Sequence, residues 1–366
     1  LRRAMGKRRS KEEMEKLRTS FIEGAKIKSI SEATANRIFD QLASFASFGF
    51  CKSHAAAFAR TCYESAYLKV HYPAEFYCAL LNNQPMGFYS PEVIVNDAKR
   101  HGVPILPVDI NRSSGSCTVE ESGVCLGFRY VKEVGEASIR KIEERSKGFY
   151  YSLRDLYQRT RLEREAMENL ILVGALDCFQ IPKRQLLWQL GLIIHEPDHA
   201  LPLDLHQVQP ALPEMSDMEQ VSADYRIQGL SHRYHPMELF RRGISKDGIL
   251  RSSEIKALFA DTHVRVAGYV VCRQAPGTAK GHVFLTLEDE DGLLNVVLKP
   301  RVYEKYRHIA RMEPLVAVEG IIQKKDGTIN ILAERLLPLR KERKRQSLLP
   351  SRPEEGCCQE STQVIV

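Results

Sequence analysis

The sequence has no apolar run close to the roughly 18 residues that a membrane-spanning helix needs, and its N-terminus does not resemble a signal peptide. Its nine cysteines form no Cys-x-x-Cys pair, which argues against a zinc framework and against a disulfide scaffold. These absences predict a soluble protein of the reducing cytoplasm, with no membrane contact. The first residue is Leu1 rather than Met, which we interpret as the sign of a fragment of a longer protein.

A uniform positive charge is also missing, although the net charge is +7. Residues 1–30 hold ten Lys or Arg against four Glu, and residues 340–366 hold six against four, so the middle of the chain is close to neutral. This distribution suits local phosphate contacts better than a coat around nucleic acid. The basic end, RKERKRQ followed by Ser, Pro and Glu, predicts a disordered tail over residues 340–366.

The segment 48–77 combines a polar turn with a helix rich in alanine and aromatic residues. Ser53 is a favoured N-cap residue, and Pro73 cannot continue the helix. The pattern predicts a helix packed on two sides, with free N–H groups at its start and Lys52 and His54 beside them as anion-binding candidates. The alternative is that Lys52 and His54 only flank a capped core helix.

Two glycine-containing turns indicate contacts to a DNA backbone. The strand-like residues 128–131 lead through Lys132, Glu133 and Gly135 into a helix, and Gly174 separates two helical stretches in LILVGALDCF. Glycine allows backbone N–H groups to approach a phosphate closely, with a helix N-terminus behind them. A pair of such turns resembles tandem helix-hairpin-helix motifs, although any helix entry can carry a glycine.

Residues 262–339 alternate apolar and polar side chains in five runs, and one helical stretch, VYEKYRHIARM, follows the third run. This order predicts an OB-fold β-barrel. Asp291-Gly292 and Asp326-Gly327 are hairpin signals, and Gly268 and Gly320 lie within strands where a small barrel bends. OB-folds bind DNA, RNA, sugars or proteins, so the fold does not fix the ligand.

Several segments resemble the C-family bacterial DNA polymerases. They are LRRAMGK at 1–7, GFCKSHAAAFA at 49–59, YLKVHYPAEFYCALLNNQPMGFY at 67–89 and ILPVDIN at 105–111. GLSHRYHPMEL at 229–239 and RQAPGTAKGHVFLTLEDEDG at 273–292 are similar to the error-prone, damage-inducible paralogue of the replicative alpha subunit. The resemblance runs from Leu1 to about residue 339 in unchanged order.

The resemblance implies a multidomain α+β fold. Its expected parts are the C-terminal part of the fingers domain at 1–84, tandem helix-hairpin-helix motifs at 85–192, a connector at 193–261 and the OB-fold at 262–339. The fingers helices would face the incoming nucleotide, with Arg2 and Arg3 near its triphosphate and Lys52 and His54 in a nucleotide- or phosphate-binding motif. Lys132, Gly135 and Gly174 would then contact duplex DNA.

Departures from the family pattern limit what this chain is expected to do. Polymerase chemistry uses palm carboxylates that hold Mg²⁺, and no PDxDxDF-like stretch is present, so no catalytic residue is assigned here. Asp289 and Asp291 are interpreted as turn residues. The family's usual lysine-glycine pair is Lys132-Glu133 here, and this carboxylate would oppose a phosphate. No QxxLF-like clamp-binding peptide occurs in 193–222, which suggests recruitment to the sliding clamp by helper mutagenesis proteins.

Two functions follow from these patterns. The first is the C-terminal part of an error-prone DNA-directed DNA polymerase, acting on primer-template and dNTP in translesion synthesis, with Mg²⁺ bound by the full-length enzyme. The alternative is a stand-alone, non-enzymatic DNA-binding module. No metal site is expected, because His232 and His235 lack a third ligand nearby in the sequence. Trp188 is expected in the core, and Tyr303 and Tyr306 are as consistent with packing as with base stacking.

Overall fold

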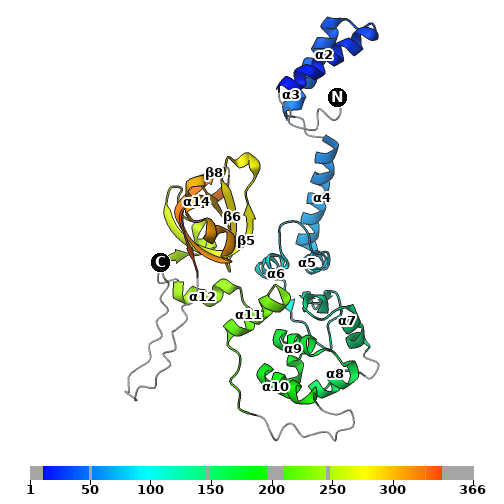
Figure 1. Cartoon of the computed structure of the whole chain (residues 1–366), viewed down its shortest axis with the longest axis vertical. Helices are drawn as coiled ribbons and strands as arrows, with labels where there is room; N and C mark the ends of the chain where they lie inside the picture. The colour runs from blue at the N-terminus through cyan, green and yellow to red at the C-terminus, as the bar shows by residue number, and fades with distance from the viewer. Residues whose placement is uncertain are drawn as a thin grey trace. The chain divides into compact units, whose positions relative to one another are not determined.

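The computed structural model describes residues 11–48, 52–144, 148–195, 210–244, 248–325 and 327–339 of the 366-residue chain (Figure 1). The chain forms two compact units, Leu1–Tyr72 and Pro73–Val366. The first is helical, and the second combines helices with two sheets, which confirms the predicted α+β fold class. Within the described ranges, no helix combines the length and the hydropathy that crossing a bilayer requires.

The first unit begins with a pair of helices that pack through aromatic side chains. Its helices are α2 (Lys11–Ile27), α3 (Glu32–Phe48) and α4 (Lys52–His71). The ring centroids of Phe21 and Phe39 lie 5.7 Å apart, and the Arg18 guanidinium lies 5.0 Å from the Phe39 ring centroid. Phe39 is only 1% exposed, so α2 and α3 share a small core.

Helix α4 is exposed along its length, and the prediction that it packs on two sides is wrong for the described residues. No side chain from Ser53 to His71 is buried, and Phe58, Tyr63 and Val70 are 57%, 75% and 73% exposed. The apolar residues of α4 are spread over several faces, so they form no single broad stripe of the kind that buries a helix against a core.

The second unit starts with α5, whereas the boundary after residue 84 stays a prediction for the fingers domain. Ala74, Tyr77, Cys78 and Leu81 of α5 are buried in the same core as the helices that follow. The Tyr77 hydroxyl also donates a 2.7 Å hydrogen bond to Asp97 Oδ2 on α6. The first elements of the unit are α5 (Pro73–Asn82), α6 (Pro91–Arg100), β1 (Ile105–Leu106), β2 (Thr118–Glu120) and β3 (Gly123–Cys125), with the three strands in the order β1-β3-β2.

Short helices surround an apolar core over residues 128–193. The elements are η1 (Phe128–Tyr130), α7 (Glu136–Glu143), α8 (Leu153–Thr160), α9 (Arg164–Val173), η2 (Asp177–Phe179) and α10 (Lys183–Ile193). Phe128, Leu156, Met167 and Leu170 are fully buried in this core. The turns between the helices therefore rest on a rigid base.

The connector predicted at 193–261 is partly helical and joins two cores. It contains α11 (Asp217–Gln228), α12 (Pro236–Ile244), β4 (Ile249–Leu250) and α13 (Ser252–Ile255). A capping box between Ser216 and Glu219 starts α11. Ile227 packs into the core of the short helices, whereas Met237 of α12 packs against Ala267 and Ala317 of the barrel. Residues 196–209 lie outside the described ranges, as do residues 340–366, where we predicted a disordered tail.

Residues 263–338 form the predicted five-stranded barrel, which confirms the OB-fold (Figure 1). Its strands and helices are β5 (His263–Gln274), β6 (Val283–Glu288), β7 (Leu293–Leu298), α14 (Pro300–Lys305), α15 (Arg307–Met312), β8 (Leu315–Lys325) and β9 (Thr328–Pro338). Pairing of β5 with β8 closes the order β5-β6-β7-β9-β8. The register of β8 and β9 shifts at Gly320, where a Cβ atom would lie 2.3 Å from the carbonyl oxygen of Leu332.

Candidate nucleic-acid interface

The first hairpin, residues 131–135 between η1 and α7, turns its tip toward solvent. Val131 and Val134 are buried, whereas Lys132 and Glu133 are exposed. Glu133 has φ of 65°, a left-handed conformation that costs a residue other than glycine about 1 kcal/mol. Gly135 caps α7, and no atom lies within 4 Å of the place where its Cβ would be. The backbone at the start of α7 is therefore open to a ligand such as a phosphate.

Lys132 is held by two neighbouring helices. Its ammonium donates to the carbonyl of Arg226 at the end of α11, and its carbonyl accepts a 2.9 Å bond from Asn169 Nδ2 of α9. A lysine ammonium has three donors, so one bond to Arg226 leaves donors for a phosphate oxygen. These contacts fix the hairpin on α9 and α11 without removing the lysine charge from the surface.

The turn at residue 174 requires a glycine for structural reasons. Gly174 ends α9 with φ of 89°, and its N–H and that of Ala175 bond to carbonyls of α9. A Cβ at residue 174 would lie 2.7 Å from Asp177 Oδ2, which itself pairs with Arg233 at 3.2 Å. These two N–H groups are used inside the protein, so the DNA contact predicted for Gly174 stays a prediction.

One face of the barrel carries polar and aromatic side chains between buried ones. On β6 and β7, Phe284 is paired with Val297, and Thr286 with Asn295, and all four are at least partly exposed. Phe284 is 37% exposed, and Lys280 is exposed in the loop between β5 and β6. In OB-folds the second and third strands and the adjoining loops form the usual surface for single-stranded nucleic acid, where aromatic side chains stack on bases.

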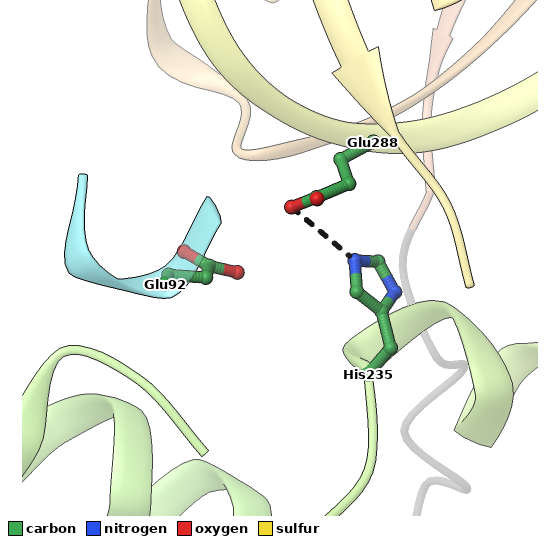
Figure 2. Close-up of side chains that lie close together, drawn as sticks. All are labelled: Glu92, His235 and Glu288. Atoms are coloured by element: carbon green, nitrogen blue, oxygen red, sulfur yellow. Dashed lines mark ion pairs between the residues drawn. The ribbon is translucent and has the colours of Figure 1, made fainter. Parts of the chain in front are cut away.

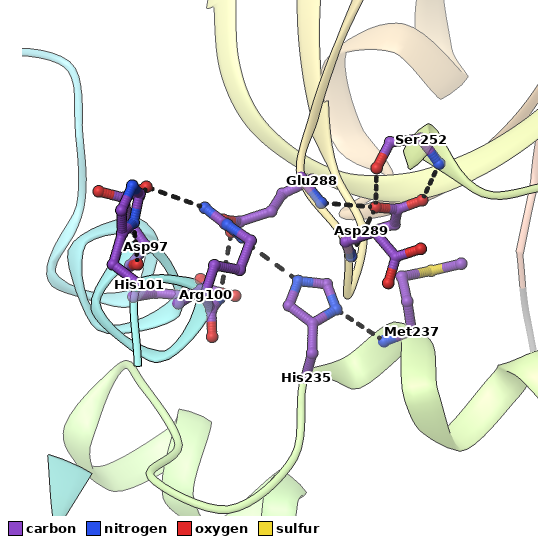
Figure 3. Close-up of polar contacts among 12 residues, drawn as sticks. Asp97, Arg100, His101, His235, Met237, Ser252, Glu288 and Asp289 are labelled. Atoms are coloured by element: carbon purple, nitrogen blue, oxygen red, sulfur yellow. Dashed lines mark hydrogen bonds and ion pairs between the residues drawn. The ribbon is translucent and has the colours of Figure 1, made fainter. Parts of the chain in front are cut away.

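The acidic loop LEDEDG is a turn that anchors the barrel, in agreement with its sequence interpretation (Figure 3). The Asp289 carboxylate is fully buried and accepts bonds from the Ser252 N–H, the Ser252 hydroxyl and the N–H groups of Asp291 and Gly292. Arg241 binds Glu290 in the same loop. Asp289 is thus committed to four protein donors and to the nearby Arg241 guanidinium, which compete with a Mg²⁺ ion for this carboxylate.

The predicted nucleotide-facing residues are only partly described. Arg2 and Arg3 lie outside the described residues, and Lys52 begins α4 with a side chain that is also outside them. His54 is exposed, with its ring centroid 4.5 Å from that of Phe58. Lys132, Gly135 and Gly174 belong to the second unit, and the roles of all these residues stay predictions.

Sequence spacing missed one buried cluster, formed by Glu92, His235 and Glu288 (Figure 2). These residues are far apart in the chain, so no local sequence motif contains them. His232 is not among them: burial and the nearby cations Arg233, Lys99 and Lys183 lower its pKa to about 3. Trp188, which was expected in the core, is half-buried on α10 and is not part of the core cluster there.

Two family models match this chain. Residues 102–186 match the helix-hairpin-helix motif, and residues 264–339 match the OB-fold nucleic acid binding domain. Among solved structures, asparaginyl-tRNA synthetase from Pyrococcus horikoshii aligns with 24% of this chain and 22% of its own, at 24% identity and a TM-score of 0.22. That likeness is too small to carry an argument.

Curated relatives align with nearly the whole chain. The error-prone DNA polymerase of Corynebacterium efficiens is 40% identical over 341 residues, which are 93% of this chain and 32% of the relative. That of Anaeromyxobacter dehalogenans strain 2CP-C is 39% identical over 354 residues, which are 93% of this chain and 31% of the relative. Over 93% of its length the chain is therefore similar to error-prone DNA polymerases, and it spans about a third of the length of the curated relatives it matches.

Proposed function

We propose that this chain is the C-terminal part of a DNA-directed DNA polymerase of the error-prone kind, which copies damaged templates in translesion synthesis and causes damage-induced mutagenesis. The observation that carries the proposal is the ordered pair of nucleic-acid-binding domains in a chain similar to these polymerases over nine-tenths of its length. The helix-hairpin-helix region would hold the duplex, and the barrel would hold single-stranded template. Its place of action would be the cytoplasm.

The first hairpin is the best-supported duplex contact. Gly135 leaves the start of α7 uncovered, and Lys132 adds a charge at the same tip. Contacts of this type bind phosphates and position the duplex without reading its sequence. The carboxylate of Glu133 opposes a phosphate there, so this hairpin would bind duplex weakly compared with one that has glycine at this position.

Mg²⁺ would be bound by the full-length enzyme through carboxylates that this chain does not supply. Asp289 is saturated by protein donors, and Asp291 accepts from Ser253 and lies near Arg251. Neither aspartate therefore fits a role in a catalytic magnesium pair. The dNTP would approach the fingers helices near Arg2, Arg3, Lys52 and His54. Helper mutagenesis proteins would bring the enzyme to the sliding clamp.

The purified 366-residue chain is expected to bind primer-template and to extend no primer in the presence of dNTPs and Mg²⁺, because the metal-binding carboxylates are missing from it. Fluorescence anisotropy measures the binding, and a gel assay measures extension, with a full-length relative as the positive control. Mg²⁺-dependent incorporation by the chain alone would show that it holds a catalytic metal site. No binding to either duplex or single-stranded DNA would contradict the proposed function.

Lys132→Ala is expected to weaken duplex binding equally for all sequences and to reduce the slope of log K against log salt by about 1, as loss of one phosphate contact does. Asn169→Ala is the matched control, since it releases the Lys132 carbonyl but keeps the charge. The control should leave the salt slope unchanged. An unchanged slope in Lys132→Ala would mean that this ammonium serves only the Arg226 carbonyl.

A further inference from the structure

A buried polar junction joins the helix-hairpin-helix region to the barrel. Glu92 lies on α6, His235 precedes α12, and Glu288 ends β6, with exposed fractions of 3%, 4% and 0%. One polar side-chain atom from each, a carboxylate oxygen or a ring nitrogen, lies within 4.8 Å of those of the other two, and Figure 2 shows the three side chains pointing toward one another. Two carboxylates buried this close need a compensating charge or a proton.

Arg100 compensates only one of the two carboxylates. Its Nη1 donates a 2.8 Å bond to Glu288 Oε1, and Asn96 Nδ2 donates a 3.1 Å bond to Glu288 Oε2 (Figure 3). Glu92 instead accepts a 2.5 Å bond from the neutral hydroxyl of Tyr225. The arrangement therefore places a cation in hydrogen-bond contact with Glu288, whereas Glu92 is bonded to a neutral hydroxyl and is influenced by the Lys99 charge only at longer range.

His235 does not supply a charge either. Its Nδ1 accepts a 3.1 Å bond from the Met237 N–H, so the ring proton of the neutral imidazole is on Nε2. Nε2 is buried without a hydrogen-bond partner and lies 3.8 Å from Glu288 Oε2. A metal ion at Nε2 would need a lone pair there, which the Met237 bond opposes. The three residues fit a shared proton better than a metal ion.

We propose that Glu92 is protonated in the folded protein and that this proton allows α6 and the barrel to pack against each other. Burial is the main cause, and with the neighbouring Glu288 it raises the pKa of Glu92 to about 8, against the opposing effects of Tyr225 and Lys99. α6 belongs to the part with the hairpins, and Glu288 belongs to the barrel. The proton thus sets how firmly the two nucleic-acid-binding parts are held together.

The charged and titratable groups around Glu92 come from every neighbouring element. They are Lys99 and Arg100 on α6, Tyr225 on α11, His235 before α12, Tyr269 on β5 and Glu288 on β6. Burial lowers the pKa of Lys99 to about 8, so Lys99 makes folding more favourable as the pH rises above 8. His232 acts in the same direction at acidic pH, between about 3 and its ordinary value of 6.5.

Glu92 changes stability with pH in the opposite direction, between pH 4.5 and about 8. Because its pKa rises from 4.5 to about 8 on folding, the folded state binds the extra proton, and stability falls as the pH rises between these values. Glu92→Gln keeps the side-chain shape and is neutral at every pH. The ratio of the wild-type folding constant to that of Glu92→Gln should fall by up to about tenfold per pH unit in this window.

Urea unfolding of the whole chain across this pH window tests the proposal. The matched control is Glu165→Gln, at an exposed position on α9, and its ratio to wild type should not vary with pH. At pH 8, amide hydrogen exchange in α6 and β6 should be slower in Glu92→Gln than in wild type and equal in α8. A wild-type-to-variant ratio that stays constant with pH, or equal exchange in α6 and β6, would overturn the proposal.

A measurement on wild-type protein covers the case in which Glu92→Gln does not fold. Carbon-13 NMR of labelled glutamate should show one carboxyl group that titrates near pH 8. If every carboxyl group titrates near its ordinary pKa, the proposal fails. Excess Zn²⁺ or Mn²⁺ should leave the unfolding midpoint unchanged. If a metal ion raises the midpoint and the rise is lost when Glu92 is replaced, the cluster is a metal site and the proposal fails.

Discussion

Asp289→Ala is expected to lower the free energy of unfolding by about 3 to 5 kcal/mol, the range for removing one partner of a buried charged network. The Asp289 carboxylate is fully buried and is the acceptor for four donors from Ser252, Asp291 and Gly292. Alanine would leave these donors unpaired and would remove a carboxylate 3.6 Å from the buried Arg241. Urea unfolding of the chain measures the effect.

Asp291→Ala is the control for this experiment, since it changes the same residue type in the same loop. Asp291 is 26% exposed, and its carboxylate accepts from the Ser253 hydroxyl, so its loss should cost about 1 kcal/mol or less. Equal losses in the two variants would show that the Asp289 bonds do not hold the barrel on α13. Mg²⁺ should not stabilise the wild-type chain, because Asp289 is already saturated with donors.

The barrel was predictable from the sequence because its signals are local. β5, HVRVAGYVVCRQ, lies within the alternating region 262–339 that predicted the barrel, since alternation of apolar and polar residues is visible within one strand. Gly320 was recognisable for a similar reason: a glycine inside an apolar strand signals a bulge or a close backbone approach, and both occur there. The two nucleic-acid-binding parts could therefore be ordered along the chain in advance.

Features that depend on distant residues were not predictable in this way. Glu92, His235 and Glu288 meet only after α6, the segment before α12 and the end of β6 have packed together. In the sequence His235 was considered as a ligand only together with His232, and His232 is not part of the cluster. The exposure of α4 was missed for a related reason, because composition shows how apolar a helix is but not which surface covers it.

Glu133→Gly is expected to strengthen duplex binding roughly fivefold at low salt, since removing a like charge beside a phosphate is worth about 1 kcal/mol. The same variant should raise the free energy of unfolding by about 1 kcal/mol, because Glu133 has φ of 65° and glycine adopts that conformation without strain. Anisotropy with primer-template duplex and urea unfolding measure the two effects. High salt should reduce the gain in affinity by screening the repulsion.

Glu133→Ala separates the two causes, because it removes the carboxylate but keeps a Cβ atom on the left-handed backbone. Both variants should gain the same duplex affinity, and only glycine should gain stability. If neither variant binds duplex more tightly at low salt, the tip formed by Lys132 and Glu133 does not face a phosphate, and the first hairpin is not the duplex contact. If both gain affinity, Gly135 and the start of α7 remain the surface on which the DNA backbone rests.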